Sequence, residues 1–89
     1  MDVERFMDFI AAKDSISYSN SSDGVNDYNT LRIVYATIKG NTIVIAGTDA
    51  EIEIDIPCIK EIKHIETDNM IKIIHDSGEL YITYSPGDN

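Results

Sequence analysis

The sequence predicts an α+β domain, in which an N-terminal amphipathic helix packs on a bent antiparallel sheet or a small, partly open barrel of five to six strands. Three observations predict it: a helical apolar repeat at the start, a stretch that alternates carboxylate and isoleucine, and 16 isoleucines among 89 residues. Isoleucine favours strands because its branched β-carbon suits a pleated surface. The length predicts a single domain over residues 1–89.

The N-terminal segment has the pattern of an amphipathic helix over residues 3–13. Asp2 is placed to cap its first turn. The apolar residues follow the i, i+3, i+4, i+7 spacing of one helical face: Val3, Phe6, Met7 and Ile10. We expect this helix to cover one side or one open end of the sheet. The alternative is a helix that binds a partner and presents Phe6 and Phe9 to it.

Residues 15–29 are dominated by Ser, Asn, Asp and Gly, which predicts a polar loop. As an alternative, Ile16 and Tyr18 alternate with serines and would form a short edge strand, with a turn over residues 21–24. Tyr18 and Tyr28 are candidate partner-binding residues, because binding surfaces often use tyrosine as an anchor.

From Leu31 onward the pattern predicts antiparallel strands, which together span residues 31–84. Short runs of strand-forming residues alternate with turn residues, and Pro57 marks a bend at residues 57–60. The expected strands cover residues 31–38, 42–46, 51–56, 61–67, 70–75 and 79–84, and residues 85–89 form a frayed tail.

This order of elements resembles two families of small β modules. A helix followed by a five-strand meander resembles Sm-like proteins, and the run Ile56-Pro57-Cys58-Ile59-Lys60-Glu61-Ile62 is similar to the bend between strands in bacterial PH-like domains. The resemblance implies topology alone. The glycine and asparagine positions with which Sm-like proteins bind RNA are absent, so no site is carried over.

The alternating stretch places three carboxylates on one face of a strand. Glu51, Glu53 and Asp55 share that face, and Asp49 extends the row. Ile52, Ile54 and Ile56 share the other face. Residues two apart on a strand lie about 6.5 to 7 Å from each other, which is comparable to the phosphate spacing along one DNA strand. The row therefore predicts a partner-binding face that stands in for phosphates.

A different interpretation of the row is an ordinary polar outer face, which also discourages aggregation between sheet edges. Under that interpretation Lys60, Lys63 and Lys72, all in the second half of the chain, would pair with the carboxylates.

Charge and residue content exclude several function classes. Sixteen acidic residues against seven basic ones give a net charge of -9, which disfavours direct binding to nucleic acid or to a membrane surface. Cys58, His64 and His75 lack the spacing of a catalytic or zinc site, so we expect no enzyme, no metal and no cofactor. The single cysteine and the lack of a signal peptide or long apolar run predict a cytoplasmic protein.

The sequence therefore predicts a small, acidic, non-enzymatic binding protein. We expect it to dock on a basic protein surface and inhibit that partner, in the manner of phage or mobile-element inhibitors of nucleic-acid-binding defence proteins. The alternative is a structural or scaffolding β module that self-associates into a homo-oligomer, because 16 isoleucines are many for the core of one small monomer.

Overall fold

A computed structural model of the chain describes residues 1–22 and 25–85, and for residues 21, 22 and 25–28 it describes the backbone alone. Within this part the chain forms an α+β fold with one α-helix and a sheet of seven antiparallel strands. In chain order the elements are α1 (Val3–Ala11), β1 (Ser15–Ser22), β2 (Val25–Lys39), β3 (Thr42–Gly47), β4 (Glu51–Asp55), the 3-10 turn η1 (Ile56–Cys58), β5 (Ile59–Ile65), the 3-10 turn η2 (Glu66–Asp68), β6 (Met70–His75) and β7 (Gly78–Thr83).

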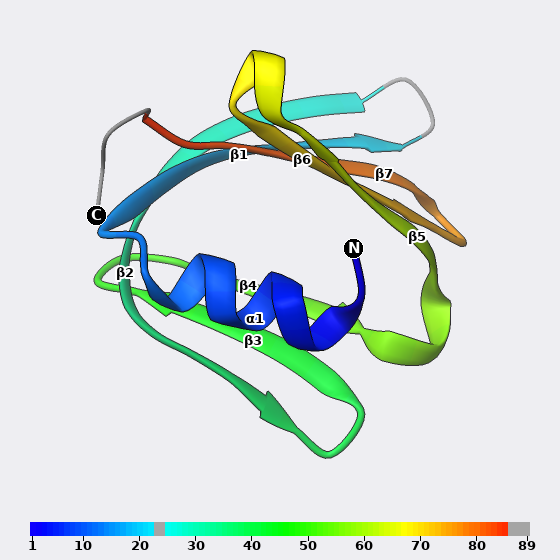
Figure 1. Ribbon diagram of the computed structural model, residues 1–89, viewed down its shortest axis with the longest axis horizontal. Helices are drawn as coiled ribbons and strands as arrows, with labels where there is room; N and C mark the ends of the chain where they lie inside the picture. Colours follow the sequence, from blue (N-terminus) through cyan, green and yellow to red (C-terminus); the bar gives the residue numbers. More distant parts are fainter. Residues whose placement is uncertain (23–24, 86–89) are drawn as a thin grey trace.

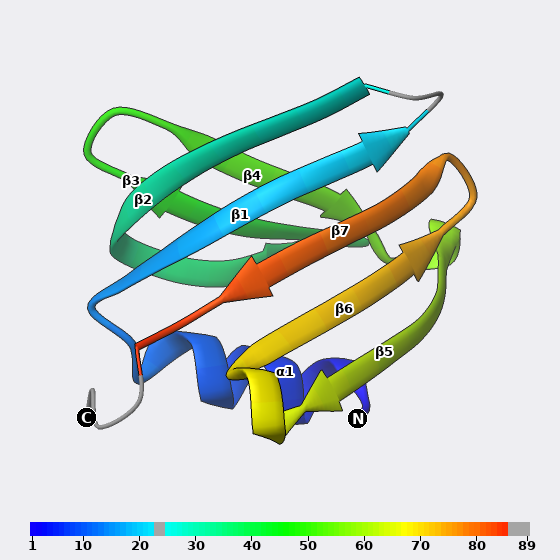
Figure 2. The same cartoon turned by 90° about the horizontal axis from the view of Figure 1, so that it is seen from above.

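The sheet is one ribbon of strands in the order β4-β3-β2-β1-β7-β6-β5, and it folds over on itself at β2. This strand pairs with β1 as far as Arg32 and with β3 from Ile33 onward, with a register shift between Ile33 and Tyr35. Figure 1 shows the two resulting layers facing each other, and Figure 2 shows β2, β1, β7, β6 and β5 side by side in the larger layer. The sheet does not close into a barrel, since β4 and β5 remain at its two ends.

The core lies between the two layers. It is made almost entirely of aliphatic side chains on the inner faces: Phe6, Ile10, Ile16, Leu31, Ile43, Ile45, Ile52, Ile54, Ile62, Ile71, Ile73, Leu80 and Ile82. Of the 16 isoleucines, only Ile38 is classed as exposed, at 43%. Ten isoleucines are buried and five are partly buried, because a folded-over sheet presents two inner faces to one core.

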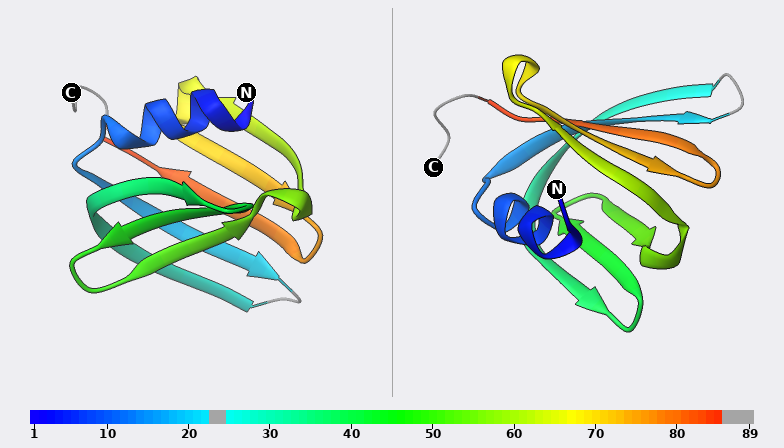
Figure 3. Two further views of the ribbon diagram at one scale, coloured as in Figure 1. Left: turned by 90° about the horizontal axis from the view of Figure 1, so that it is seen from below. Right: turned by 45° about the vertical axis from the view of Figure 1, so that its right-hand side comes forward.

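Helix α1 lies along the open side between the two layers (Figures 1 and 3). The Asp2 carboxylate accepts a hydrogen bond from the Arg5 main-chain N–H at 2.8 Å, so the predicted cap is confirmed. Phe6 and Ile10 are fully buried on the face that meets the sheet. The helix ends at Ala11, two residues before the predicted end.

The prediction of a polar loop over residues 15–29 is wrong. Ser15–Ser22 forms β1, and residues 25–29 begin β2. Nor is β1 an edge strand, because it lies between β2 and β7. Ile16 faces the core, whereas Ser17 lies on the outer face near Thr30 and accepts a bond from Thr83 through its carbonyl. The serine-rich composition predicts a loop, but pairing with β2 and β7 stabilises this segment as a strand.

The added strand explains why the sheet has seven strands instead of five to six. In the second half of the chain the strands lie within about two residues of their predicted positions. The bend predicted at residues 57–60 is the turn η1 over Ile56–Cys58, slightly earlier. The tail prediction falls mostly on residues 86–89, outside the described part of the chain.

Candidate functional site

The candidate site is the acidic outer face of β4. Ile52 and Ile54 are each 7% exposed and belong to the core, while Glu51, Glu53 and Asp55 are exposed, so the predicted alternation is confirmed. We call these three carboxylates the acidic row. Asp49 is also exposed, in the bend that leads into β4.

Two contacts with the neighbouring hairpin position β4 and its row. The Thr42 hydroxyl donates a hydrogen bond to an Asp55 carboxylate oxygen at 3.0 Å, and the Ile56 main-chain N–H donates to the Asn41 carbonyl oxygen at 2.8 Å. Both contacts tie the end of β4 to the start of β3. The row is thus carried by a packed strand, and the side of β4 away from β3 has no strand partner in the described structure.

The lysines in the second half of the chain lie elsewhere. Lys60 and Lys63 are on β5, and Lys72 on β6 forms an ion pair with Glu79 at 3.0 Å. None of the ion pairs found among the described residues involves the acidic row. The structure therefore gives no support to the interpretation in which these lysines neutralise the row.

A cavity of about 200 Å³ lies beside β4, between this strand and the ends of β1, β6 and β7. Its apolar walls come from Ile52, Ile54 and Leu80. The polar groups around them are Asn20, Glu53, Asp55, Cys58, His75 and Ser77. The sequence does not predict this cavity, because its lining residues come from separate parts of the chain.

Cys58 and His75 both line the cavity, whereas His64 lies elsewhere, on β5. Desolvation raises the pKa of the Cys58 thiol, and the nearby carboxylates of Asp76 and Asp55 raise it further. A thiol with a raised pKa holds little thiolate at neutral pH and is a weak nucleophile.

The structure does not place Tyr18 beside the acidic row. Tyr18 lies on β1, where it is half-buried and packs against the core. Tyr28 lies in the backbone of β2, and its side chain is outside the described structure. Asp49 and the acidic row follow one another at every second residue of the chain, but the structure places neither tyrosine side chain beside them.

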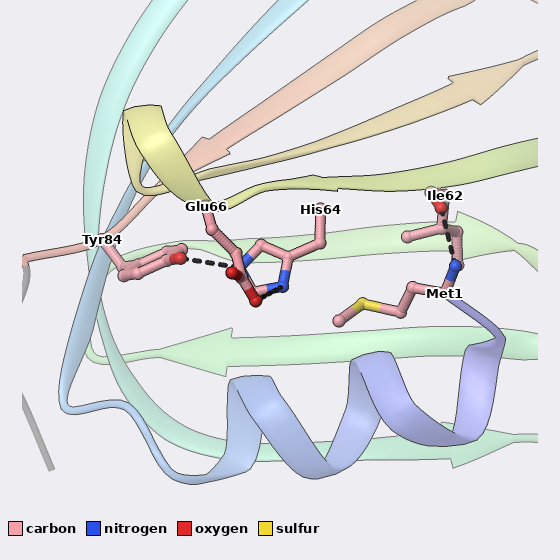
Figure 4. Close-up of polar contacts among 5 residues, drawn as sticks. All are labelled: Met1, Ile62, His64, Glu66 and Tyr84. Carbon is pink, nitrogen blue, oxygen red and sulfur yellow. Dashed lines mark hydrogen bonds and ion pairs between the residues drawn. The ribbon is translucent and has the colours of Figure 1, made fainter.

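A second polar cluster joins α1 to β5 and the end of β7 (Figure 4). The Nε2 atom of His64 lies 2.6 Å from the Tyr84 hydroxyl, and Phe9 makes an edge contact with each ring at 4.9 Å. Lys13 lies over the Phe9 and Tyr84 rings. Desolvation and then Glu66 raise the pKa of Tyr84. This cluster attaches the helix to the sheet.

Among the described side chains, no group of three or more His, Cys, Asp or Glu residues is arranged to hold a metal ion. In the same part of the chain, no helix has the length and apolar content needed to cross a membrane. Comparisons of the chain with protein-family models, with curated proteins and with solved structures find no match.

Proposed function

We propose that this chain is a small, acidic, non-enzymatic binding protein that docks its β4 face on a basic surface of a partner protein and inhibits that partner. The partner class we propose is a nucleic-acid-binding protein, including the defence proteins that phages and mobile elements inhibit. The observation that carries the proposal is an acidic row that is exposed, held on a packed strand and without an ion pair among the described residues.

Charge spacing supports the choice of partner. Successive carboxylates of the row lie about 6.5 to 7 Å apart on one face of β4, and a surface that binds DNA is built for phosphates at a similar spacing. The chain's net charge of -9 attracts such a surface over long range.

One observation favours a second candidate function, a self-associating β module. The C-terminal half of β2 exposes Val34 at 61%, Tyr35 at 44% and Ile38 at 43%. Pairing between β1 and β2 stops at Arg32, so this half has no strand partner on that side in the described structure. Burial of ten of the other isoleucines weakens this candidate, because few large apolar side chains among the described residues are left exposed for an interface.

The test is an affinity pull-down from host lysate with three baits. The first is the wild type, the second carries Glu51→Lys, Glu53→Lys and Asp55→Lys, and the third is a control with the same net charge. The control reverses three exposed carboxylates elsewhere, with the substitutions Asp8→Lys, Glu61→Lys and Asp68→Lys.

We expect the wild type and the control to retain a nucleic-acid-binding protein that the row variant loses. Adding the purified wild type should then release nucleic acid from that protein. If all three baits retain the same proteins, the row is only a solvated face. If the wild type retains only its own copies, the self-associating module is the better description.

A further inference from the structure

We infer that the free edge of β4 and the cavity beside it form a docking site for an extended segment of the partner, in which basic and apolar residues alternate. The segment would add an antiparallel strand to the sheet, with its basic side chains against the acidic row and an apolar side chain in the cavity. This inference rests on the proposed function and specifies how the partner is held.

The first step concerns the main chain of β4. The Ile56 N–H points toward β3, because it donates to Asn41. Main-chain groups alternate in direction along an antiparallel strand, so those of Ile52 and Ile54 also face β3. The groups of Glu51, Glu53 and Asp55 therefore face the free edge, where another strand can bond to them.

The second step concerns the side chains of an added strand. Residues directly opposite each other in a sheet point to the same face. A residue opposite Glu53 would therefore project beside the acidic row, where a lysine or arginine is favoured. A residue opposite Ile52 or Ile54 would point inward, where an apolar side chain is favoured. The added segment thus alternates basic and apolar residues over about five positions, the length of β4.

The third step concerns the space available. The cavity of about 200 Å³ has Ile52 and Ile54 on one wall and Leu80 on another. An engineered apolar cavity of about 150 Å³ holds benzene, so this space suits one side chain of the size of leucine or phenylalanine. Helix α1 does not obstruct this cavity, because α1 lies beside the C-terminal half of β2, with β3 and β4 farther from it (Figure 2).

Charge decides between a partner and a second copy of this chain as the occupant. Two β4 strands paired edge to edge would place the acidic rows side by side, and like charges directly opposite are destabilising. Each copy also carries a net charge of -9. A basic segment from another protein gains from the same charges.

The probe is a fluorescein-labelled nine-residue peptide of alternating lysine and leucine, measured by anisotropy at 0.15 M salt. A control peptide of the same composition has all its leucines before its lysines. Two further peptides keep the alternation and are methylated on main-chain nitrogens. One carries the methyl groups on the main-chain nitrogens of its lysines, and the other on the main-chain nitrogens of its leucines. In a bonded antiparallel pair, opposite residues exchange both main-chain hydrogen bonds. The main-chain N–H of a lysine opposite Glu53 would therefore bond to the free edge of β4.

We expect the alternating peptide to bind at least tenfold more tightly than the block peptide. Methylation of the main-chain nitrogens of the lysines should abolish binding, and methylation of the main-chain nitrogens of the leucines should affect it much less. Amide hydrogen exchange at Glu53 should slow when the peptide binds, whereas the amides of Ile52 and Ile54 are protected already. Glu53→Pro, which removes the edge N–H, should weaken binding at least tenfold more than Glu53→Gln.

Equal binding of the alternating and block peptides, lost when the acidic row is reversed, would overturn the strand pairing and leave the proposed function standing. No binding of any peptide would also overturn the inference, and the pull-down would decide the proposed function independently. Slow exchange at Glu53 without peptide, together with a mass that rises with concentration, would assign the edge to a second copy.

Discussion

The ammonium group of Lys72 lies 3.0 Å from a carboxylate oxygen of Glu79, between the adjacent strands β6 and β7. The Tyr81 hydroxyl donates to the same oxygen. This trio lies on the outer face of the larger layer, so one of the chain's few cations is engaged away from the acidic row. The ion pair between Lys72 and Glu79 neutralises charge on the larger layer, while the acidic row on the other layer keeps its negative charge.

The first prediction concerns the pH dependence of this trio. Hydrogen bonds from Tyr81 and Lys72 lower the pKa of Glu79 below its usual value of 4.5. A carboxylate with a lowered pKa contributes stability above its unfolded pKa, and that stability is lost as the pH falls through the folded pKa. Glu79→Gln should therefore lower the melting temperature at pH 7, and the difference from wild type should shrink below about pH 4.

Thermal unfolding followed by circular dichroism from pH 7 to pH 3 measures this difference. Glu51→Gln is the control, because Glu51 is an exposed carboxylate on β4, in the other layer, without an ion pair among the described residues. A difference for Glu79→Gln that stays constant over this pH range would show that the charge of Glu79 contributes nothing.

The second prediction concerns two glycines with different roles. A Cβ atom on Gly47 would lie 2.7 Å from the Arg32 carbonyl oxygen and 2.7 Å from Leu31 Cγ, where the two layers meet. Gly40 has open space around it but a φ of 62°, in the turn between β2 and β3. Gly47→Ala should cost about 1–3 kcal/mol through steric overlap, and Gly40→Ala about 1 kcal/mol through backbone strain.

Asparagine separates the two causes, because it tolerates a positive φ but needs more space than alanine. Gly40→Asn should be close to wild type in urea unfolding, whereas Gly47→Asn should be less stable than Gly47→Ala. Similar losses for both asparagine variants would contradict the close approach at Gly47.

The third prediction tests the contact between α1 and the sheet. Tyr84→Phe removes the hydroxyl that lies 2.6 Å from His64 and keeps the ring against Phe9. We expect a loss of about 1 kcal/mol, the usual net value of a hydrogen bond. Phe9→Leu should lose ring contacts with both residues and cost more. Urea unfolding measures both variants, and an unchanged Tyr84→Phe variant would mean that the hydrogen bond between His64 and Tyr84 contributes nothing to stability.

The parts of this fold that the sequence predicts are those governed by local pattern. The alternation in β4 predicts its burial because strand geometry alone decides which side chains share a face. The cap at Asp2 and the turn between the expected strands 31–38 and 42–46 follow from residue type in the same way.

The parts that the sequence does not predict depend on partners distant in the chain. Strand β1 is serine-rich and is stabilised by pairing with β2 on one side and β7 on the other. The cavity unites Asn20, Ile54 and Leu80, which only the folded-over sheet brings together. The sequence predicts the charges of the acidic row, but only the strand order shows that the main chain of β4 has a free edge.

The fourth prediction asks whether the acidic row contributes to folding. Glu51 and Glu53 are exposed, make no ion pair among the described residues, and lie two residues apart on one face, where like charges repel. The double substitution Glu51→Gln and Glu53→Gln should therefore leave stability unchanged or raise the melting temperature by about 1–3 °C at low salt. In 1 M salt, where the screening length is about 3 Å, this gain should disappear. Lys72→Met is the opposite control, because it breaks the pair with Glu79 and should lower the melting temperature at low salt. A clear destabilisation by the double substitution would mean that these carboxylates stabilise the fold, which would contradict the proposal that they are exposed to bind a partner.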